Sequence, residues 1–206
     1  MQGEDVHKIS IFSYTMRISG GKARGIPLRV TKSSILRPAT EANRERLFSS
    51  LQLKVQDAKI LDLFAGSGAY GLEALSRGAK SVHFVENHRK IYRDLTYNFE
   101  QVQKSANLCK SAASFTSWDA IDFLRKAQDS YDIIFLDPPY PEFPKIGEKI
   151  FTLLLVNHFV HANTLLIHEA PMEALSVFNG WEKIKVLGKE KKGSPSFRLF
   201  SPSPSA

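Results

Sequence analysis

The middle of the chain alternates between short apolar runs and longer stretches with helical periodicity. Strand-like runs cover residues 59–64, 81–86, 131–136 and 164–169, with a weaker one near 107–111. Helical stretches lie between them, at residues 69–78, 88–103, 118–127 and 145–157. This alternation predicts a doubly wound, mostly parallel α/β sheet. The apolar strands lack a polar face, which predicts helices on both sides of the sheet.

The two ends of the chain have different patterns. Residues 183–188 and 196–200 are joined by the short polar segment KEKKGSP, which leaves no room for a crossover helix. They predict an antiparallel hairpin at the edge of the sheet. Residues 16–30 are typical of a short hairpin, and residues 41–53 of a helix with one apolar face.

These patterns divide the chain into four parts. We expect an extension at 1–15, a basic N-terminal segment at 16–57, an α/β domain at 58–200 and a tail at 201–206.

Composition supports one sizeable core. The chain has 206 residues, of which 43% are hydrophobic, and a single cysteine, so no internal disulfide can form. The first ten residues carry acids and no long apolar stretch, which argues against a signal peptide. The histidines lack metal-ligand spacing. We therefore expect a cytoplasmic monomer that contacts no membrane and holds no metal.

The net charge of +7 is concentrated near the N-terminus. Eight basic and two acidic residues lie between Met16 and Leu47, so this segment holds +6 of the total. A concentrated basic segment attracts phosphate backbones. On charge alone, an ordinary solvated surface is an equally good interpretation.

A glycine-rich loop follows the first strand of the α/β part. Gly66, Gly68 and Gly71 satisfy GxGxxG, and Glu86 ends the next strand at the spacing of a ribose-binding acid. The pattern suits any cofactor that carries adenosine, including NAD and S-adenosylmethionine. Asp62 favours the second, because a carboxylate there would repel a pyrophosphate but attract an ammonium or sulfonium group. Its alternative role is to cap the following helix.

The segment FLDPPY ends another buried strand at the same predicted edge of the sheet. Pro138 and Pro139 fix φ and lack backbone donors, which leaves the Asp137 carboxylate and the Pro138 carbonyl as rigid acceptors beside the ring of Tyr140. Two acceptors next to an aromatic face suit a planar base with an exocyclic amine. A proline-rich turn capped by Asp137 is the structural alternative.

Four segments together resemble a known family. DLFAGSGAYGLEALSRGA at 62–79 and FLDPPY at 135–140 are similar to class I S-adenosylmethionine-dependent methyltransferases that act on amines. RISGGKARGIPLRV at 17–30 and LRPATEANRERLFSSL at 36–51 resemble the RsmD family. The resemblance implies a seven-stranded Rossmann-like sheet with an antiparallel last strand. It also implies methylation of the exocyclic N2 of a guanine in 16S ribosomal RNA, on assembled or partly assembled small ribosomal subunits.

The resemblance also assigns roles to residues. It implies that S-adenosylmethionine is bound by Asp62, Gly66, Ser67, Gly68, Glu86 and Asp119. It implies that the amine and its base are held by Asp137, Pro138 and Tyr140. It implies that RNA is contacted by Arg17, Gly20, Gly21, Lys22, Arg24, Arg37 and Arg44. For Asp119, helix capping is an additional role.

Three rival functions remain open on the sequence. DPPY also occurs in enzymes that methylate adenine N6 or cytosine N4 of DNA. A non-catalytic RNA-binding assembly protein could keep the same scaffold, and a nicotinamide oxidoreductase would share GxGxxG. Trp118 could line an adenine pocket or lie in the core, and we expect the core. His168 could act as an acid or base at a strand end, but we expect a structural histidine.

Overall fold

The computed structural model describes residues 16–30, 41–171, 177–188 and 195–204. The predictions for Arg37 and for the extension at 1–15 lie outside the described residues. No described helix is both long and apolar enough to cross a membrane.

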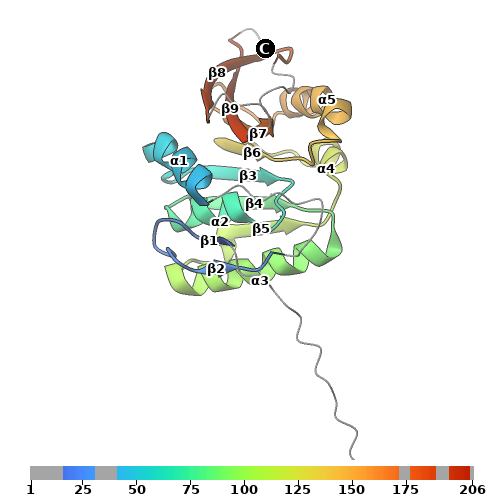
Figure 1. The fold of residues 1–206 in the computed structure, drawn as a ribbon. Helices are drawn as coiled ribbons and strands as arrows, with labels where there is room; N and C mark the ends of the chain where they lie inside the picture. Colours follow the sequence, from blue (N-terminus) through green and yellow to red (C-terminus); the bar gives the residue numbers. More distant parts are fainter. Residues whose placement is uncertain (1–15, 31–40, 172–176, 189–194, 205–206) are drawn as a thin grey trace, which may run out of the picture.

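A seven-stranded sheet forms the centre of the molecule (Figure 1), with the strand order β5-β4-β3-β6-β7-β9-β8. Its strands are β3 (Lys59–Leu63), β4 (Ser81–Val85), β5 (Ala113–Thr116), β6 (Ile133–Leu136), β7 (Leu165–Pro171), β8 (Trp181–Leu187) and β9 (Pro195–Pro202). The first five are parallel, and β9 runs antiparallel to both of its neighbours. Because chain order reverses at β3, ligands are expected in the crevice outside the carboxyl ends of β3 and β6.

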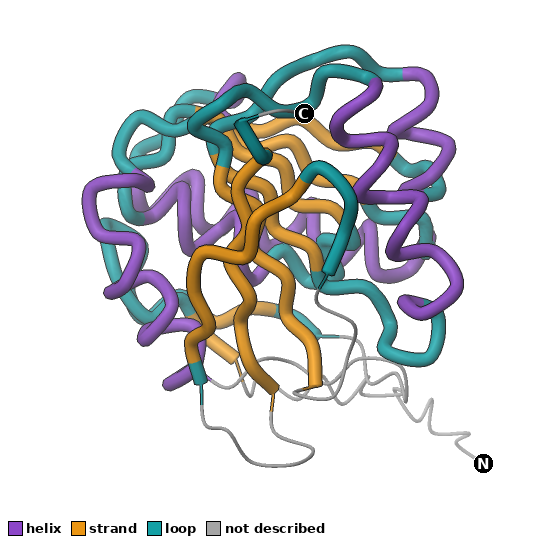
Figure 2. The backbone as a smooth tube through the Cα atoms, turned by 90° about the horizontal axis from the view of Figure 1, so that it is seen from above, coloured by secondary structure: helices purple, strands orange, loops and turns teal. Residues whose placement is uncertain are grey.

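Helices cover both faces of this sheet (Figure 2). They are α1 (Glu41–Leu51), α2 (Ala69–Ser76), α3 (Arg89–Ala106), α4 (Ala120–Lys126) and α5 (Phe143–Val156), with short 3-10 turns η1 (Gln52–Val55) and η2 (Lys110–Ala112). One hydrophobic cluster joins α1, α2 and α3 to one face of the sheet, and a second joins α4 and α5 to the other. The predicted doubly wound α/β fold with an antiparallel last strand is confirmed.

One strand was predicted in the wrong place. The weak strand near 107–111 is instead β5 at 113–116, after Asn107 ends α3 in a left-handed conformation and η2 has turned the chain. A short edge strand with only partly buried side chains carries little hydrophobic signal.

The N-terminal segment packs against the α/β core. β1 (Met16–Arg17) pairs with β2 (Pro27–Leu28) in an antiparallel ribbon. Ile18, Ala23 and Leu28 are fully buried in the same cluster as α1, α2 and α3. The basic segment is thus anchored to the α/β core by its apolar residues.

Candidate active site

The glycine loop that follows β3, predicted to bind the cofactor, is shaped by backbone conformations that favour glycine. Gly66 and Gly68 have φ values of +55° and +81°. A Cβ on Gly68 would lie 2.4 Å from Leu95 Cδ1, so a larger residue would have to shift the Leu95 side chain as well as adopt the positive φ. The amide of Asn98 donates to the Ser67 carbonyl at 2.9 Å, which ties the loop to α3.

Glu86 is held in place by two backbone hydrogen bonds. Its Oε2 accepts a hydrogen bond from the Gly66 N–H at 2.9 Å, and its Oε1 accepts one from the His88 N–H at 2.7 Å. The carboxylate therefore links the end of β4 to the glycine loop. Each oxygen keeps a further lone pair, which suits acceptance from two ribose hydroxyls.

Asp62 lies beneath the loop and is almost fully buried. Its Oδ2 accepts a hydrogen bond from the Gly71 N–H at 2.9 Å, so the capping alternative is realised at the start of α2. Burial, together with the negative charge of Glu86, raises the pKa of Asp62 to about 7. The hydrogen bond from Gly71 acts in the opposite direction and lowers this pKa. A nearby cation would restore the ionised form. These residues thus fit a cofactor that carries adenosine at one end and positive charge at the other.

Asp119 is the N-cap of α4, as its alternative role predicted. Its Oδ1 accepts from the backbone N–H of Ile121 at 2.8 Å, and the side chain is exposed. Contact with adenine stays a prediction. Trp118 was predicted to lie in the core, and this is wrong: 47% of the residue is exposed, and the Lys126 ammonium lies 5.1 Å from its ring centroid.

The DPPY segment leaves β6 at the same edge of the sheet as the cofactor loop. Asp137 is partly exposed, Pro138 is buried and Tyr140 is half-buried. The pKa of Asp137 is raised well above its usual value, first by burial and then by the charges of Glu169 and Asp62. The structure therefore gathers the predicted amine acceptor and the predicted cofactor residues at one rim.

Sequence reasoning did not assign Glu169 to this site. Glu169 follows His168 on β7 and is 3% exposed, and its Oε2 accepts a hydrogen bond from the Tyr70 hydroxyl. A signal was present in the sequence. Three acids lie at this edge of the sheet: Asp62, Asp137 and Glu169. Each comes two positions after a buried strand residue, namely Ile60, Phe135 and Ile167. Residues two apart on a strand share a face, so the acids project toward the α2 side of the sheet.

His168 has a different environment on the opposite face. It is buried against Phe143, with ring centroids 4.0 Å apart, and its pKa is lowered to about 3 by burial and by Arg198. A histidine that is neutral at physiological pH supports the structural role over an acid/base role.

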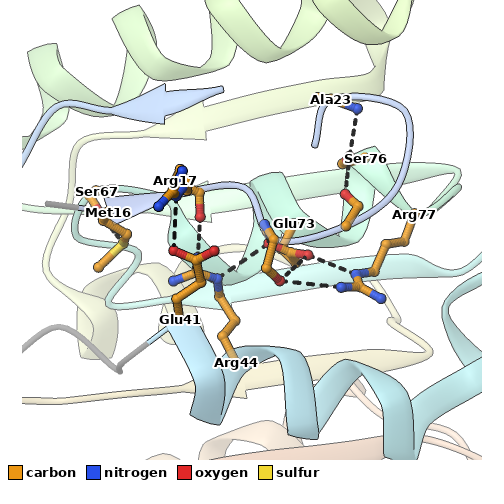
Figure 3. A network of polar contacts seen from close by, with 12 residues as sticks. Met16, Arg17, Ala23, Glu41, Arg44, Ser67, Glu73, Ser76 and Arg77 are labelled. Atoms are coloured by element: carbon orange, nitrogen blue, oxygen red, sulfur yellow. Dashed lines mark hydrogen bonds and ion pairs between the residues drawn. The ribbon is translucent and has the colours of Figure 1, made fainter. Parts of the chain in front are cut away.

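The prediction that Arg44 faces RNA is wrong. Arg44 is fully buried, and its Nε donates to Glu73 Oε2 at 3.3 Å (Figure 3). Its Nη2 also donates to the Arg17 carbonyl. An arginine whose whole side chain is buried cannot reach a phosphate at the surface. Its ion pair with Glu73 on α2 explains why the burial of its charge is tolerated.

The other predicted RNA-binding residues lie at the surface or support it. Arg17, Lys22 and Arg24 are exposed, and Arg17 pairs with Glu41 at 3.2 Å. A Cβ on Gly21 would lie 2.0 Å from the Ser76 carbonyl oxygen. Gly20 is similarly close to the Arg77 guanidinium, so these two glycines allow the hairpin to pack closely on α2. RNA contact by this surface stays a prediction.

Two further features of the described chain frame the site. No group of three or more His, Cys, Asp or Glu side chains in that part is arranged to hold a metal ion. A surface pocket lies at the opposite edge, near the starts of β3, β6 and β7, and none of the predicted site residues lines it.

Comparison with known proteins agrees with this arrangement. The family model described as Conserved hypothetical protein 95 matches residues 16–201, which is most of the chain. The chain belongs to this family. Two curated members are both named Ribosomal RNA small subunit methyltransferase D. The one from Haemophilus influenzae is 33% identical over 90% of this chain and 93% of its own length. The one from Escherichia coli K12 is 35% identical over 90% and 89%.

A solved structure of the family has the same fold. A putative methyltransferase from Escherichia coli, yhhF, superposes with a TM-score of 0.77 at 31% identity and covers 91% of this chain and 97% of its own. The resemblance to the RsmD family and the Rossmann-like methyltransferase fold are thereby confirmed.

Proposed function

We propose that this protein is an S-adenosylmethionine-dependent methyltransferase that modifies the exocyclic N2 of a guanine in small-subunit ribosomal RNA. The proposal extends to this chain the activity that the names of its relatives state, namely methylation of small-subunit ribosomal RNA. One observation carries it furthest: a partly exposed Asp137, followed by two prolines, lies at the same rim as the glycine loop and Glu86.

S-adenosylmethionine supplies an electrophilic methyl group on a positively charged sulfur. Glu86 accepts hydrogen bonds from the ribose, and Gly66 and Gly68 let the backbone approach the ligand closely. Asp62 lies below the loop, where its carboxylate favours a cationic ligand.

At the second half of the site, Asp137 and the Pro138 carbonyl accept the two N–H bonds of the target amine. The amine lone pair is delocalised into the ring, so holding both hydrogens on one side favours a pyramidal nitrogen with its lone pair directed at the methyl group. Tyr140 stacks on the base, which must leave its helical stack to enter. Most of the acceleration then comes from positioning the two reactants.

RNA binding is assigned to the exposed basic residues of the N-terminal hairpin. Arg17, Lys22 and Arg24 place three positive charges on one short segment. This segment packs on α2, the helix that directly follows the glycine loop. Phosphate contacts of this kind set the position of an RNA without reading its sequence. We further propose that an assembled or partly assembled subunit is the substrate.

The decisive experiment transfers tritiated methyl groups from S-adenosylmethionine to small subunits isolated from cells that lack this protein. Nucleoside analysis is expected to find the label as N2-methylguanosine. The Asp137→Ala variant serves as control and should bind the cofactor without transferring label. Label on DNA, or no label on subunits and free ribosomal RNA despite cofactor binding, would overturn the proposal.

A further inference from the structure

Three acids, of which Asp62 and Glu169 are buried and Asp137 is partly exposed, lie in order across the carboxyl edge of the sheet. β3, β6 and β7 are adjacent parallel strands. Asp62 is the penultimate residue of β3, Asp137 follows β6, and Glu169 follows the last residue of β7 that pairs with β6. Leu136 pairs with His168, so Asp137 and Glu169 are the next residues along strands about 4.8 Å apart. The cofactor loop follows β3. A base whose amine meets the cofactor at Asp137 therefore extends from β6 toward β7.

Glu169 is equipped to accept one more hydrogen bond. Among the described residues, the hydroxyl of Tyr70 donates to Oε2, and none donates to Oε1. Burial raises its pKa to about 7, whereas the Tyr70 hydrogen bond and the charge of Arg44 lower it. Arg44 Nη1 is itself buried without a hydrogen-bond partner among the described residues. An N–H donor at Oε1 would further favour the carboxylate.

The bases with exocyclic amines differ in the atom beside that amine. In guanine, the neighbouring ring atom N1 carries a hydrogen and is a donor. In adenine and cytosine, the corresponding ring nitrogen carries a lone pair and is an acceptor. A carboxylate next to the amine site binds the first arrangement and repels the second.

We propose that Glu169 is a specificity-determining residue, which accepts a hydrogen bond from guanine N1–H while Asp137 holds the N2 amine. The inference rests on the proposed function, because it explains how a DPPY site selects guanine. Tyr70 acts as a positioning residue that holds Oε2 and leaves Oε1 directed at the base.

The test replaces the target guanine by 2-aminopurine, which keeps the 2-amine but carries a lone pair at N1. The substituted 16S RNA is made by ligation and assembled into subunits, and N2 methylation is measured for both bases. Wild-type protein is expected to prefer guanine by about 10³-fold or more, because a site built around a donor rejects an analogue that lacks it. Equal rates on both bases would overturn the inference without any variant.

The variant Glu169→Gln sharpens the test. The Tyr70 hydroxyl can still donate to the amide oxygen, which turns the NH₂ group toward the base as a donor. The preference for guanine should then fall below tenfold. Glu169→Asp keeps an acceptor and should keep discrimination at a lower rate. Glu182→Gln, the same change at an exposed position on β8, should leave the preference unchanged.

The outcomes separate two kinds of failure. If wild-type protein makes no N2-methylguanosine on any ribosomal RNA substrate, the proposed function fails. If it makes N2-methylguanosine but Glu169→Gln discriminates as the wild type does, only the role of Glu169 is refuted. Cofactor affinity is measured for each variant and should match that of the wild type.

Discussion

Glu73 on α2 is the centre of a buried polar network, and its removal should strongly destabilise the protein. The fully buried carboxylate accepts hydrogen bonds from the Ser19 N–H and Oγ, both at 2.8 Å, from Arg44 Nε at 3.3 Å and from Arg77 Nε at 2.7 Å (Figure 3). The variant Glu73→Ala leaves the fully buried Arg44 without its counter-charge.

The expected cost follows from this uncompensated charge. Breaking a buried ion pair from one side costs about 3–5 kcal/mol. For a chain of this size, each kcal/mol lowers the melting temperature by about 2–4 °C, so we expect a decrease of about 6–20 °C. Urea unfolding measures the change in the free energy of unfolding, and thermal unfolding measures the change in melting temperature. The control is Glu100→Ala at an exposed position on α3, which should change stability by less than about 0.5 kcal/mol.

A double variant distinguishes pairing from simple loss of packing. The double variant Arg44→Met/Glu73→Met replaces both partners by apolar residues and so removes the unpaired charge. The remaining cost in stability comes chiefly from the hydrogen bonds that Glu73 made to Ser19 and Arg77. We expect the double variant to cost about 1–3 kcal/mol, less than Glu73→Ala alone. A cost below about 1 kcal/mol for Glu73→Ala, or a double variant less stable than the single one, would refute the reasoning.

Four further predictions concern the site. Asp137→Ala should lower methyl transfer by at least about 10²-fold while the cofactor dissociation constant stays within twofold, as measured by single-turnover assay and calorimetry. Glu86→Ala should weaken cofactor binding by about 10²-fold, because two charged hydrogen bonds to the ribose are lost; an unchanged calorimetric titration would contradict its assignment. Reversing both charges in Lys22→Glu/Arg24→Glu should weaken RNA binding, spare cofactor binding and lower the slope of log K against log salt by about 1.5; equal loss of both affinities would refute the RNA assignment. The folded-state pKa of Asp62 is raised from 3.8 to about 7, so its contribution to stability is present below pH 4 and is lost as pH rises through 7. Asp62→Asn should therefore flatten the pH dependence of the free energy of unfolding in urea between these pH values. An unchanged pH profile would contradict this assignment.

The sequence predicts those features of the fold that depend on local pattern. Apolar strand runs, the Gly66–Gly68 turn and the strand-end acids Asp62 and Asp137 each have a signal within a few residues. The burial of Arg44 could not be predicted, because its partner Glu73 lies 29 positions away on another helix. When that pairing is not known, a buried arginine in a basic segment cannot be distinguished from an arginine that binds phosphate.

The remaining errors have similar causes. β5 has too few buried side chains to be recognised as a strand, and the apolar ring of Trp118 does not reveal that its loop lies outside the core. Glu169 was overlooked although, like Asp137, it comes at the end of a strand-like run in the sequence. Its importance emerges only when the strand order places β7 beside β6.

Helix α2 has consequences for how this protein could be recombined with others. Its first turn follows the cofactor loop, and its last turn holds the N-terminal hairpin through Ser76, which donates to the Gly20 carbonyl at 2.6 Å and accepts from the Ala23 N–H at 2.8 Å. Eight residues, a length of about 12 Å, therefore separate the glycine loop from the contacts that hold the hairpin. The hairpin cannot be exchanged as an independent module, because a recipient methyltransferase would also need Glu73, Ser76 and a glycine pair that fits against its own helix. A gene fusion that moved residues 16–30 alone would carry the positive charges without the surface that orients them.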